Sequence, residues 1–382
     1  MILEEYLNLK PLYYEKIDYE RMPRIYKKIK SSLSVLKIIH IIGTNGKGTT
    51  GRFLANALFS MGFCVGHYTS PHILEFNERI WKDGANISDA VLEEAHQELQ
   101  KILTKDDAQT LSYFEYTTFL AMLLFRECDY VVMEAGLGGE HDATAVFAKI
   151  LTLVTPIAYD HEAFLGSSID EIAVTKLNAI NKSAILGIQK YDEVYRVADR
   201  LCAEKSLNIQ KVDAFIDDAD RQKIGEISKK LFLAPYLVEN LSLSIAALKF
   251  LNLSYGVENF SNPPLFGRLT KISENIIVDV GHNVLAASGI VDALLGNKYV
   301  VVYNSYKDKN YKEILTILKP IILHVEIIVI DDVRAAQIES IKTVLTDLEI
   351  KYELFKEVKP EFSYLVFGSF SVVETFLREY YE

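Results

Sequence analysis

The chain has 382 residues, 49% of them hydrophobic and 24% charged, which is the balance of a soluble globular protein with room for two domains. Its net charge of -11 argues against broad contact with nucleic acid or an anionic membrane. The three cysteines are scattered, which predicts reduced thiols. We find no basic-then-apolar leader and no apolar run of ~18 residues, so we expect a cytoplasmic protein.

Short apolar runs alternate with segments of helical period, so the sequence predicts a parallel sheet flanked by helices. The strands expected in the first part are 38–42, 65–68, 130–133, 150–155 and 184–186, with a helix over 52–61. A second series, at 276–280, 299–303, 326–330 and 364–367, predicts a smaller Rossmann-like α/β domain. The prolines at 263 and 264 disfavour helix and remove two backbone donors. We therefore expect domains over 1–262 and 268–382, joined by a linker at 263–267.

The first strand runs into the glycine-rich segment Gly43-Thr-Asn-Gly-Lys-Gly-Thr49, and a helix follows it. Strand, glycine turn and helix form an arrangement that binds phosphate, because the turn amides and the helix N-terminus both favour an anion. Lys47 can reach the terminal phosphates, and Thr49 or Thr50 is expected to open the helix with its hydroxyl. The spacing departs from the strict G-x4-G-K-[ST] pattern, so a plain flexible loop is the alternative.

Polar residues also follow other predicted strands, where ligands of open α/β sheets gather. They are Ser70, Glu134 and the Asp160-His161 pair, a set that suits magnesium bound with phosphate and water, although histidine is a less usual ligand. Each residue taken singly is more often structural. Lys176 lies in an apolar helical segment and is either a snorkelling surface lysine or a desolvated amine.

Nine segments of the chain carry a family resemblance. In order they are KIDYERM (16–22), HIIGTNGKGTT (40–50), YTSPHILEFNERI (68–80), LSYFEY (111–116), MEAGLGGEHDAT (133–144), AYDHEAFLG (158–166), LFGRL (265–269), VDVGHN (278–283) and FGSF (367–370). Together they resemble the folylpolyglutamate synthase/dihydrofolate synthase family of Mur-type ligases. The phosphate loop alone does not separate this family from other Mur ligases, whereas the TSPH…F…ERI segment favours the folate branch.

The resemblance implies roles for individual residues. Those matching the ATP site are Asn45, Gly46, Lys47, Gly48 and Thr49, joined by Asn240, Arg268 and Asp279. The residues that match magnesium ligands are Ser70, Glu134 and His161, with Lys47, Lys176 and His161 as catalytic groups. The pterin or folate residues are Ser112, Tyr113, Phe114, Glu115 and Asp142. Lys176 matches a lysine carbamylated by carbon dioxide, which as an anion orients the second of two Mg²⁺ ions.

The implied reaction is ATP-dependent amide formation between L-glutamate and dihydropteroate or a folate. A carboxylate acylates poorly until the γ-phosphoryl group of ATP converts it into an acyl phosphate. The sequence departs from the family at three places: Glu140-His-Asp-Ala-Thr-Ala145 replaces Arg-Leu-Asp-Ala-Thr-Asn, Thr175-Lys-Leu-Asn178 replaces Glu-Lys-Ala-Gly, and Val284 replaces a proline. These departures bear on substrate preference, because Glu140 puts an anion where the family has a cation.

Three other functions stay open at this point. A P-loop ATPase or kinase would cleave ATP without forming an amide, a Mur-type ligase would use another carboxylate, and a non-enzymatic module would bind ATP without turnover. We expect a monomer that acts on small molecules, with neither nucleic acid nor membrane as a partner. The sequence does not decide whether both glutamylation steps occur, which reduced folate is preferred, or how long a polyglutamate tail grows.

Overall fold

The computed structural model describes residues 1–11, 18–34, 36–262 and 265–381. The Pro263-Pro264 pair of the predicted linker and residues 16–17 of the first family segment lie outside the described residues. Contacts group the chain into two units. The first unit comprises Met1–Ile157, Glu162–Ile227 and Glu239–Asn262, and the second comprises Ala158–His161, Ser228–Val238 and Pro263–Glu382. The chain therefore passes between units more than once, and the boundary at 262/268 stays a prediction.

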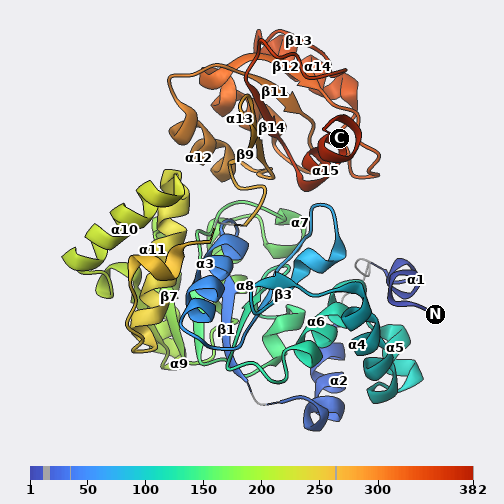
Figure 1. Ribbon diagram of the computed structural model, residues 1–382, viewed down its shortest axis with the longest axis vertical. Helices are drawn as coiled ribbons and strands as arrows, with labels where there is room; N and C mark the ends of the chain where they lie inside the picture. Colours follow the sequence, from blue (N-terminus) through green and yellow to red (C-terminus); the bar gives the residue numbers. More distant parts are fainter. Residues whose placement is uncertain (12–17, 35, 263–264, 382) are drawn as a thin grey trace. The chain divides into compact units, whose positions relative to one another are not determined.

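The first unit is built on a mostly parallel sheet of eight strands in the order β4-β3-β2-β5-β1-β6-β7-β8 (Figure 1). The strands are β1 Lys37–Ile42, β2 Val65–Tyr68, β3 Ile80–Lys82, β4 Ala85–Asn86, β5 Tyr130–Glu134, β6 Leu151–Val154, β7 Ser183–Leu186 and β8 Asn208–Lys211. The pairs β2–β3 and β3–β4 are antiparallel, and the other pairs are parallel. The central strands β1, β2, β5 and β6 are almost wholly buried, as expected for a parallel sheet covered on both faces.

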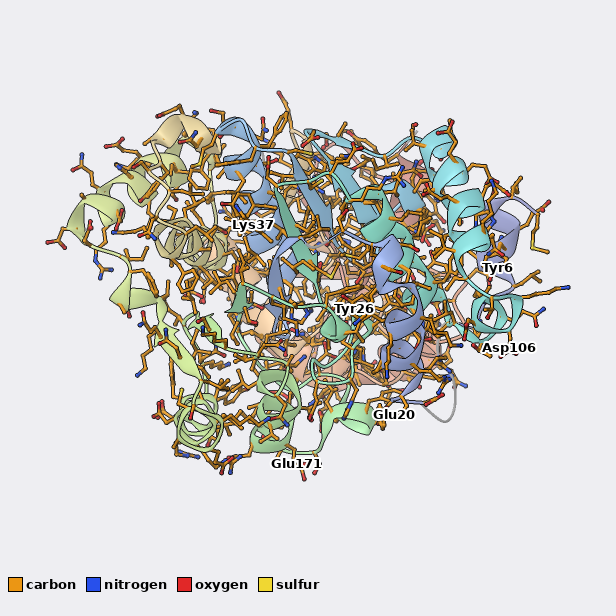
Figure 2. The ribbon with its side chains drawn as sticks, turned by 90° about the horizontal axis from the view of Figure 1, so that it is seen from below. Tyr6, Glu20, Tyr26, Lys37, Asp106 and Glu171 are labelled. Atoms are coloured by element: carbon orange, nitrogen blue, oxygen red, sulfur yellow. The ribbon has the colours of Figure 1, made fainter. Side chains whose placement is uncertain are left out.

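Eleven α-helices of the described residues precede, connect or follow these strands, and the last two, α10 and α11, lie partly in the second unit. They are α1 Leu3–Asn8, α2 Arg21–Ile29, α3 Lys47–Ser60, α4 Asp89–Ile102, α5 Lys105–Thr110, α6 Tyr113–Leu124, α7 Glu162–Leu165, α8 Ile169–Leu177, α9 Asp192–Lys205, α10 Asp218–Leu231 and α11 Pro235–Phe250. One apolar core involves α1, α2, α4 and α6, and another involves α8 and α9. Figure 2 shows Tyr6 of α1 near Asp106 of α5, where the Tyr6 hydroxyl donates to the Ala108 carbonyl at 2.7 Å.

The second unit holds a six-stranded sheet in the order β13-β12-β11-β14-β10-β9. Its strands are β9 Thr270–Ser273, β10 Ile276–Asp279, β11 Tyr299–Tyr303, β12 Ile322–Ile327, β13 Tyr352–Leu354 and β14 Tyr364–Phe367. Its later helices are α12 Val284–Leu294, α13 Tyr311–Leu318, α14 Ile338–Asp347 and α15 Phe370–Tyr380. All pairs except β9 with β10 are parallel.

The predicted fold class, two parallel α/β sheets of unequal size, is confirmed. One strand is displaced, because β12 begins four residues before the predicted 326 and ends at Ile327. The polar His324 interrupts the apolar run from which that strand was predicted, although the backbone continues through it. None of the described helices combines the length and the apolar character that a membrane span requires.

Candidate active site

The phosphate loop, residues Gly43–Gly48, connects β1 to α3. Gly43 and Gly46 have φ angles of +139° and +86°, which side chains rarely adopt. A Cβ atom at Gly43 would lie 2.1 Å from Oγ1 of Thr155, and one at Gly46 would lie 2.4 Å from Oδ1 of Asn240. The amides of Thr44 and Asn45 donate to the Pro156 carbonyl at 2.9 and 3.3 Å. Close packing against Thr155 and Asn240, together with the hydrogen bonds to Pro156, therefore fixes the shape of this loop. The ATP contact of Asn240 stays a prediction.

The helix after the loop begins earlier than the threonines. Its N-cap is Gly46, without a side-chain cap, so neither Thr49 nor Thr50 opens the helix as expected. Both hydroxyl oxygens are buried and lack a hydrogen-bond partner among the described residues. Orphaned buried hydroxyls are uncommon and indicate a missing ligand or water. The positive end of α3 and these two hydroxyls suit an anionic ligand with its counter-ion.

Glu134, at the end of β5, lies close to three other polar residues. Its Oε1 lies 3.8 Å from Nζ of Lys47. Its Oε2 accepts hydrogen bonds from the Thr69 hydroxyl and, at 3.2 Å, from the Ser70 amide. The structure thus brings together Lys47, Ser70 and Glu134, three of the predicted site residues. Thr69 was missed, although it stands beside Ser70 in the same segment.

This cluster fits a hard divalent cation. The Glu134 carboxylate is only 4% exposed, and the hydroxyl-bearing residues Thr69 and Ser70 adjoin it. A buried carboxylate needs a cation nearby, and oxygen ligands of this kind are those that Mg²⁺ and Mn²⁺ prefer. Lys47 supplies one positive charge at this position.

Lys176 is buried, with 4% exposure, in the last turn of α8. Its Nζ donates to the Gly43 carbonyl of the phosphate loop at 2.9 Å. A Cβ atom at Gly139 would lie 2.5 Å from the Lys176 carbonyl oxygen, so the second glycine turn also packs on this residue. The snorkelling surface lysine is therefore excluded, and Lys176 contacts both glycine turns of the sheet edge.

The predicted pterin segment includes residues that hold the fold. Ser112 caps α6 and forms a reciprocal capping box with Glu115. The Glu115 carboxylate also accepts from Nε of Arg21 at 2.9 and 3.0 Å, which ties α6 to α2. Asp142 is buried and accepts from the amides of Leu137 and Thr144, both at 2.9 Å. Burial raises the pKa of the Asp142 carboxyl, against the effect of these hydrogen bonds.

Tyr113 and Phe114 are half-buried. Phe114 stacks on Tyr68 with ring centroids 5.6 Å apart, and the Arg79 guanidinium lies 5.2 Å from the Tyr113 ring centroid. Nε of Arg79 donates to Nδ1 of His72 at 2.7 Å, so the TSPH and ERI parts of one segment meet here. Aromatic faces and a guanidinium are suitable neighbours for a planar heterocycle.

In the second unit, Asp279 lies at the end of β10 and is 3% exposed. Its carboxylate accepts from the Leu269 amide, the Gly281 amide and the Tyr236 hydroxyl at 2.7–2.9 Å. Burial raises its pKa, and the Arg268 charge opposes that shift. The Arg268 guanidinium lies 5.3 Å from the Phe370 ring centroid. Asp279 thus holds the backbone of its unit at Leu269 and at Gly281. The ATP contacts of Arg268 and Asp279 stay predictions.

His161 belongs to the segment Ala158–His161, which groups with the second unit, so its place in a metal set with Ser70 and Glu134 also stays a prediction. The side chain of the adjacent Asp160 is 7% exposed, and its Oδ1 lies 2.6 Å from Nζ of Lys309. Although burial would raise it, the pKa of Asp160 is held well below its usual range by His282, His161 and Lys309. Lys309 was missed because it lies in no conspicuous motif.

Glu140, the departure in the second glycine turn, is exposed and paired. Its Oε2 accepts from Nδ2 of Asn178 at 2.7 Å, and Nζ of Lys205 donates to Oδ1 of Asn178 at 2.8 Å. The Glu140 amide donates to the Thr175 carbonyl at 3.0 Å. Two departures from the family, Glu140 and Asn178, therefore contact each other.

Comparison with known proteins finds relatives that cover nearly the whole chain. It is 31% identical, over 99% of both chains, to the dihydrofolate synthase/folylpolyglutamate synthase of Buchnera aphidicola subsp. Acyrthosiphon pisum. The crystal structure of Helicobacter pylori folylpolyglutamate synthetase matches with a TM-score of 0.81 and 36% identity, covering 98% of this chain and 97% of that one. No family model matches the chain.

Two ligand complexes share the fold. Escherichia coli FolC in complex with DHPP and ADP matches with a TM-score of 0.83 and 26% identity, covering 99% of this chain and 97% of that one. A Yersinia pestis bifunctional folylpolyglutamate synthase/dihydrofolate synthase, complexed with AMPPNP and Mn ion, matches with a TM-score of 0.82 at 24% identity, covering 98% and 96%.

Proposed function

Because the chain belongs to the dihydrofolate synthase/folylpolyglutamate synthase family, we propose that it joins L-glutamate to dihydropteroate, to folates or to both, with cleavage of ATP. It is an ATP-dependent ligase of folate biosynthesis. The observation that carries the proposal is the cluster at one sheet edge, where Lys47 lies 3.8 Å from a buried Glu134 that also binds the Ser70 amide. A phosphate loop, a cation and a metal-type carboxylate meet there.

The phosphate loop would bind ATP through the uncapped N-terminus of α3, with Asn240 against the turn. Lys47 would offset the charge that develops as the γ-phosphoryl group moves to the substrate carboxylate. The carboxylate oxygen bonds to phosphorus as ADP leaves. The glutamate amine then attacks the acyl carbon, loses a proton and expels phosphate, which leaves the amide.

Two Mg²⁺ ions are proposed, the first held by Ser70, Glu134 and His161. When bound, such ions polarise phosphoryl oxygens and neutralise charge. The Mn ion of the Yersinia pestis complex and the ADP of the Escherichia coli complex support a metal and a nucleotide here. Lys176 is proposed to carry a carbamate, since its amine is buried beside the phosphate loop.

Ser112, Tyr113, Phe114, Glu115 and Asp142 are proposed as the pterin region. Tyr113 and Phe114 present rings, and Ser112 and Glu115 hold the helix start that carries them. Asp142 instead holds the second glycine turn through the Leu137 and Thr144 amides. Arg268 and Asp279 are proposed to contact ATP from the second unit. The DHPP bound by the Escherichia coli relative supports a pterin substrate.

We further propose a monomer in the cytoplasm, made of domains 1–262 and 268–382. The net charge of -11 supports small-molecule substrates over nucleic acid or anionic membrane as partners.

The deciding experiment is a product assay with ATP, glutamate and either dihydropteroate or tetrahydrofolate. We expect ADP release only when glutamate and a pterin substrate are both present, with one new amide for each ADP. ADP release without an amide would indicate an ATPase or kinase, and nucleotide binding without turnover would indicate a binding module. Amide formation with a different carboxylate would indicate another Mur-type ligase.

A further inference from the structure

A second group of metal-binding side chains lies in the second unit, on strands β12 and β13. It consists of His324, Glu326 and Glu353, whose ligand atoms all lie within 4.8 Å of one another. Glu326 and Glu353 are register partners on adjacent parallel strands, and His324 stands two residues before Glu326. Because side chains alternate along a strand, all three project from the same face of the sheet.

The distances suit one ion. Nε2 of His324 lies 3.1 Å from Oε1 of Glu326 and 3.9 Å from Oε1 of Glu353. Nitrogen and oxygen ligands at ~2.0–2.2 Å from a tetrahedral zinc ion stand about 3.3–3.6 Å apart. Small side-chain rotations would therefore bring the three atoms to a common centre. The His324 ring also packs edge-on against Phe362, with centroids 5.7 Å apart, which restricts its orientation.

The burial of Glu326 is an independent observation. Its side chain is 2% exposed, and among the described residues it accepts a hydrogen bond from His324 alone. No backbone amide or other side chain of that part of the chain satisfies this carboxylate. A buried carboxylate is costly without a cation. The cation nearest these carboxylates besides the His324 ring is the exposed Lys359, whose ammonium pairs with Glu353, whereas one divalent ion would compensate both glutamates at once.

We propose that His324, Glu326 and Glu353 bind a divalent transition-metal ion of the zinc class, with water as the remaining ligand. One imidazole and two carboxylates are a donor set for Zn²⁺ or Mn²⁺. The ion would join the three-residue edge strand β13 to β12. This site involves none of the residues assigned to the ligase reaction.

Lys359 gives the proposal a sharp test. Its Nζ lies 3.3 Å from Oε1 of Glu353, and its side chain is 40% exposed, so it competes with an ion for that oxygen and is free to turn into solvent. Removing the ammonium should strengthen metal binding. Removing a ligand should weaken it. An ion pair that never binds metal would show neither effect.

The experiment is Zn²⁺ titration calorimetry of the full chain after chelation, with excess Mg²⁺ present to occupy hard-cation sites. We expect one Zn²⁺ per chain and a rise in Tm. The variants His324→Gln and Glu353→Gln should weaken that binding at least tenfold, and Lys359→Gln should tighten it several-fold. Co²⁺ should give a visible absorption band that is lost in His324→Gln.

Glu339→Gln is the matched control, because Glu339 is an exposed carboxylate paired with Lys342 on helix α14. It should bind Zn²⁺ like the unmodified chain. The proposal is overturned if no Zn²⁺ binds below ~100 µM, or if all four variants bind it equally. Normal ligase activity in the chelated protein with Mg²⁺ would leave the proposed function intact in either case.

Discussion

Two glycine-rich turns leave adjacent strands of the first sheet, and they keep their shapes in different ways. The phosphate loop after β1 is held by the Pro156 carbonyl, which accepts the Thr44 and Asn45 amides, and by Thr155 and the Asn240 side chain, which an added Cβ at Gly43 or Gly46 would meet. The second glycine turn, residues 136–142 after β5, packs against the Lys176 backbone at Gly139 and is held at its other end by polar side chains. Asp142 accepts backbone amides within the turn, and Glu140 pairs with Asn178 of another segment.

The difference explains where the sequence varies. A turn fixed by backbone packing tolerates few substitutions, because each added atom meets an immobile neighbour. A turn held by side chains tolerates a change when its partner changes too. Glu140 and Asn178 both differ from the usual family residues, and they contact each other. The exposed end of the second turn can therefore change through paired substitutions, whereas a glycine with close neighbours, in either turn, accepts few.

The largest effect is expected at Lys47, the only cationic side chain of the phosphate loop. Lys47→Ala should lower kcat at least a hundredfold, because loss of one stabilising charge costs about 2.7–4 kcal/mol in the barrier. The unfolding free energy should change little. Steady-state kinetics and thermal unfolding measure the two effects, and a variant that retains more than a tenth of kcat would contradict the assigned role.

Lys176 joins the two turns, since it donates to Gly43 and packs on Gly139. Lys176→Ala should lower kcat by about a hundredfold, because it removes the proposed anion beside the metal. Partial rescue by acetate would separate a carbamate from a packing role. Normal activity without acetate would show that no carbamate is needed.

Gly46→Ala tests how the phosphate loop keeps its shape. A left-handed φ costs about 1–3 kcal/mol for a side chain, and the new Cβ would also meet Asn240 at 2.4 Å. Gly62→Ala is the matched control, because Gly62 has φ +90° with nothing within 4 Å of an added Cβ. Denaturant unfolding should show a larger loss for Gly46→Ala. Equal losses of unfolding free energy in the two variants would mean that the Asn240 side chain moves aside and does not fix the loop.

The smallest effects are expected at Glu140. Glu140→Arg should change stability by no more than about 0.5 kcal/mol, because exposed polar pairs contribute little. It places a cation near Lys205 and should release the turn from Asn178. If Glu140 repels a growing anionic tail, the variant should form longer polyglutamate products, and added salt should reduce the difference. Mass analysis of the products decides this point, and unchanged tail length would make Glu140 a solvated loop residue.

Much of the fold followed from apolar runs, because buried parallel strands have them. The strands at 38–42, 65–68 and 364–367 were located to within a residue. The strands that were missed, such as β4, β8 and β13, are mostly exposed and lack such runs. Their position depends on pairing with a neighbour, which a local pattern does not contain.

Part of the site was also accessible, since Lys47, Ser70 and Glu134 each end a strand or open a helix, and they do meet. The contacts of Glu115 and Asp142 were not predicted. Arg21 and Glu115 are more than ninety residues apart in the sequence, so no local pattern links them. Asp142 accepts from backbone amides, which every residue except proline has, so the sequence does not mark its partners. Thr49 was misplaced as a cap because Gly46 adopts a left-handed conformation and starts the helix first.

The strand order has a consequence for how the nascent chain acquires this site. β1 leaves the ribosome early, whereas its sheet neighbours β5 and β6 begin only at Tyr130 and Leu151. Asn240, whose side chain packs on the phosphate loop, is synthesised later still. At ~5–20 residues per second, roughly 10–40 s separate synthesis of the loop from synthesis of Asn240. For the first part of that interval, until β5 and β6 have been synthesised, the apolar β1 has no strand partner on either side. A chaperone that binds short apolar segments would thus meet this chain first at the strand that later carries the nucleotide loop.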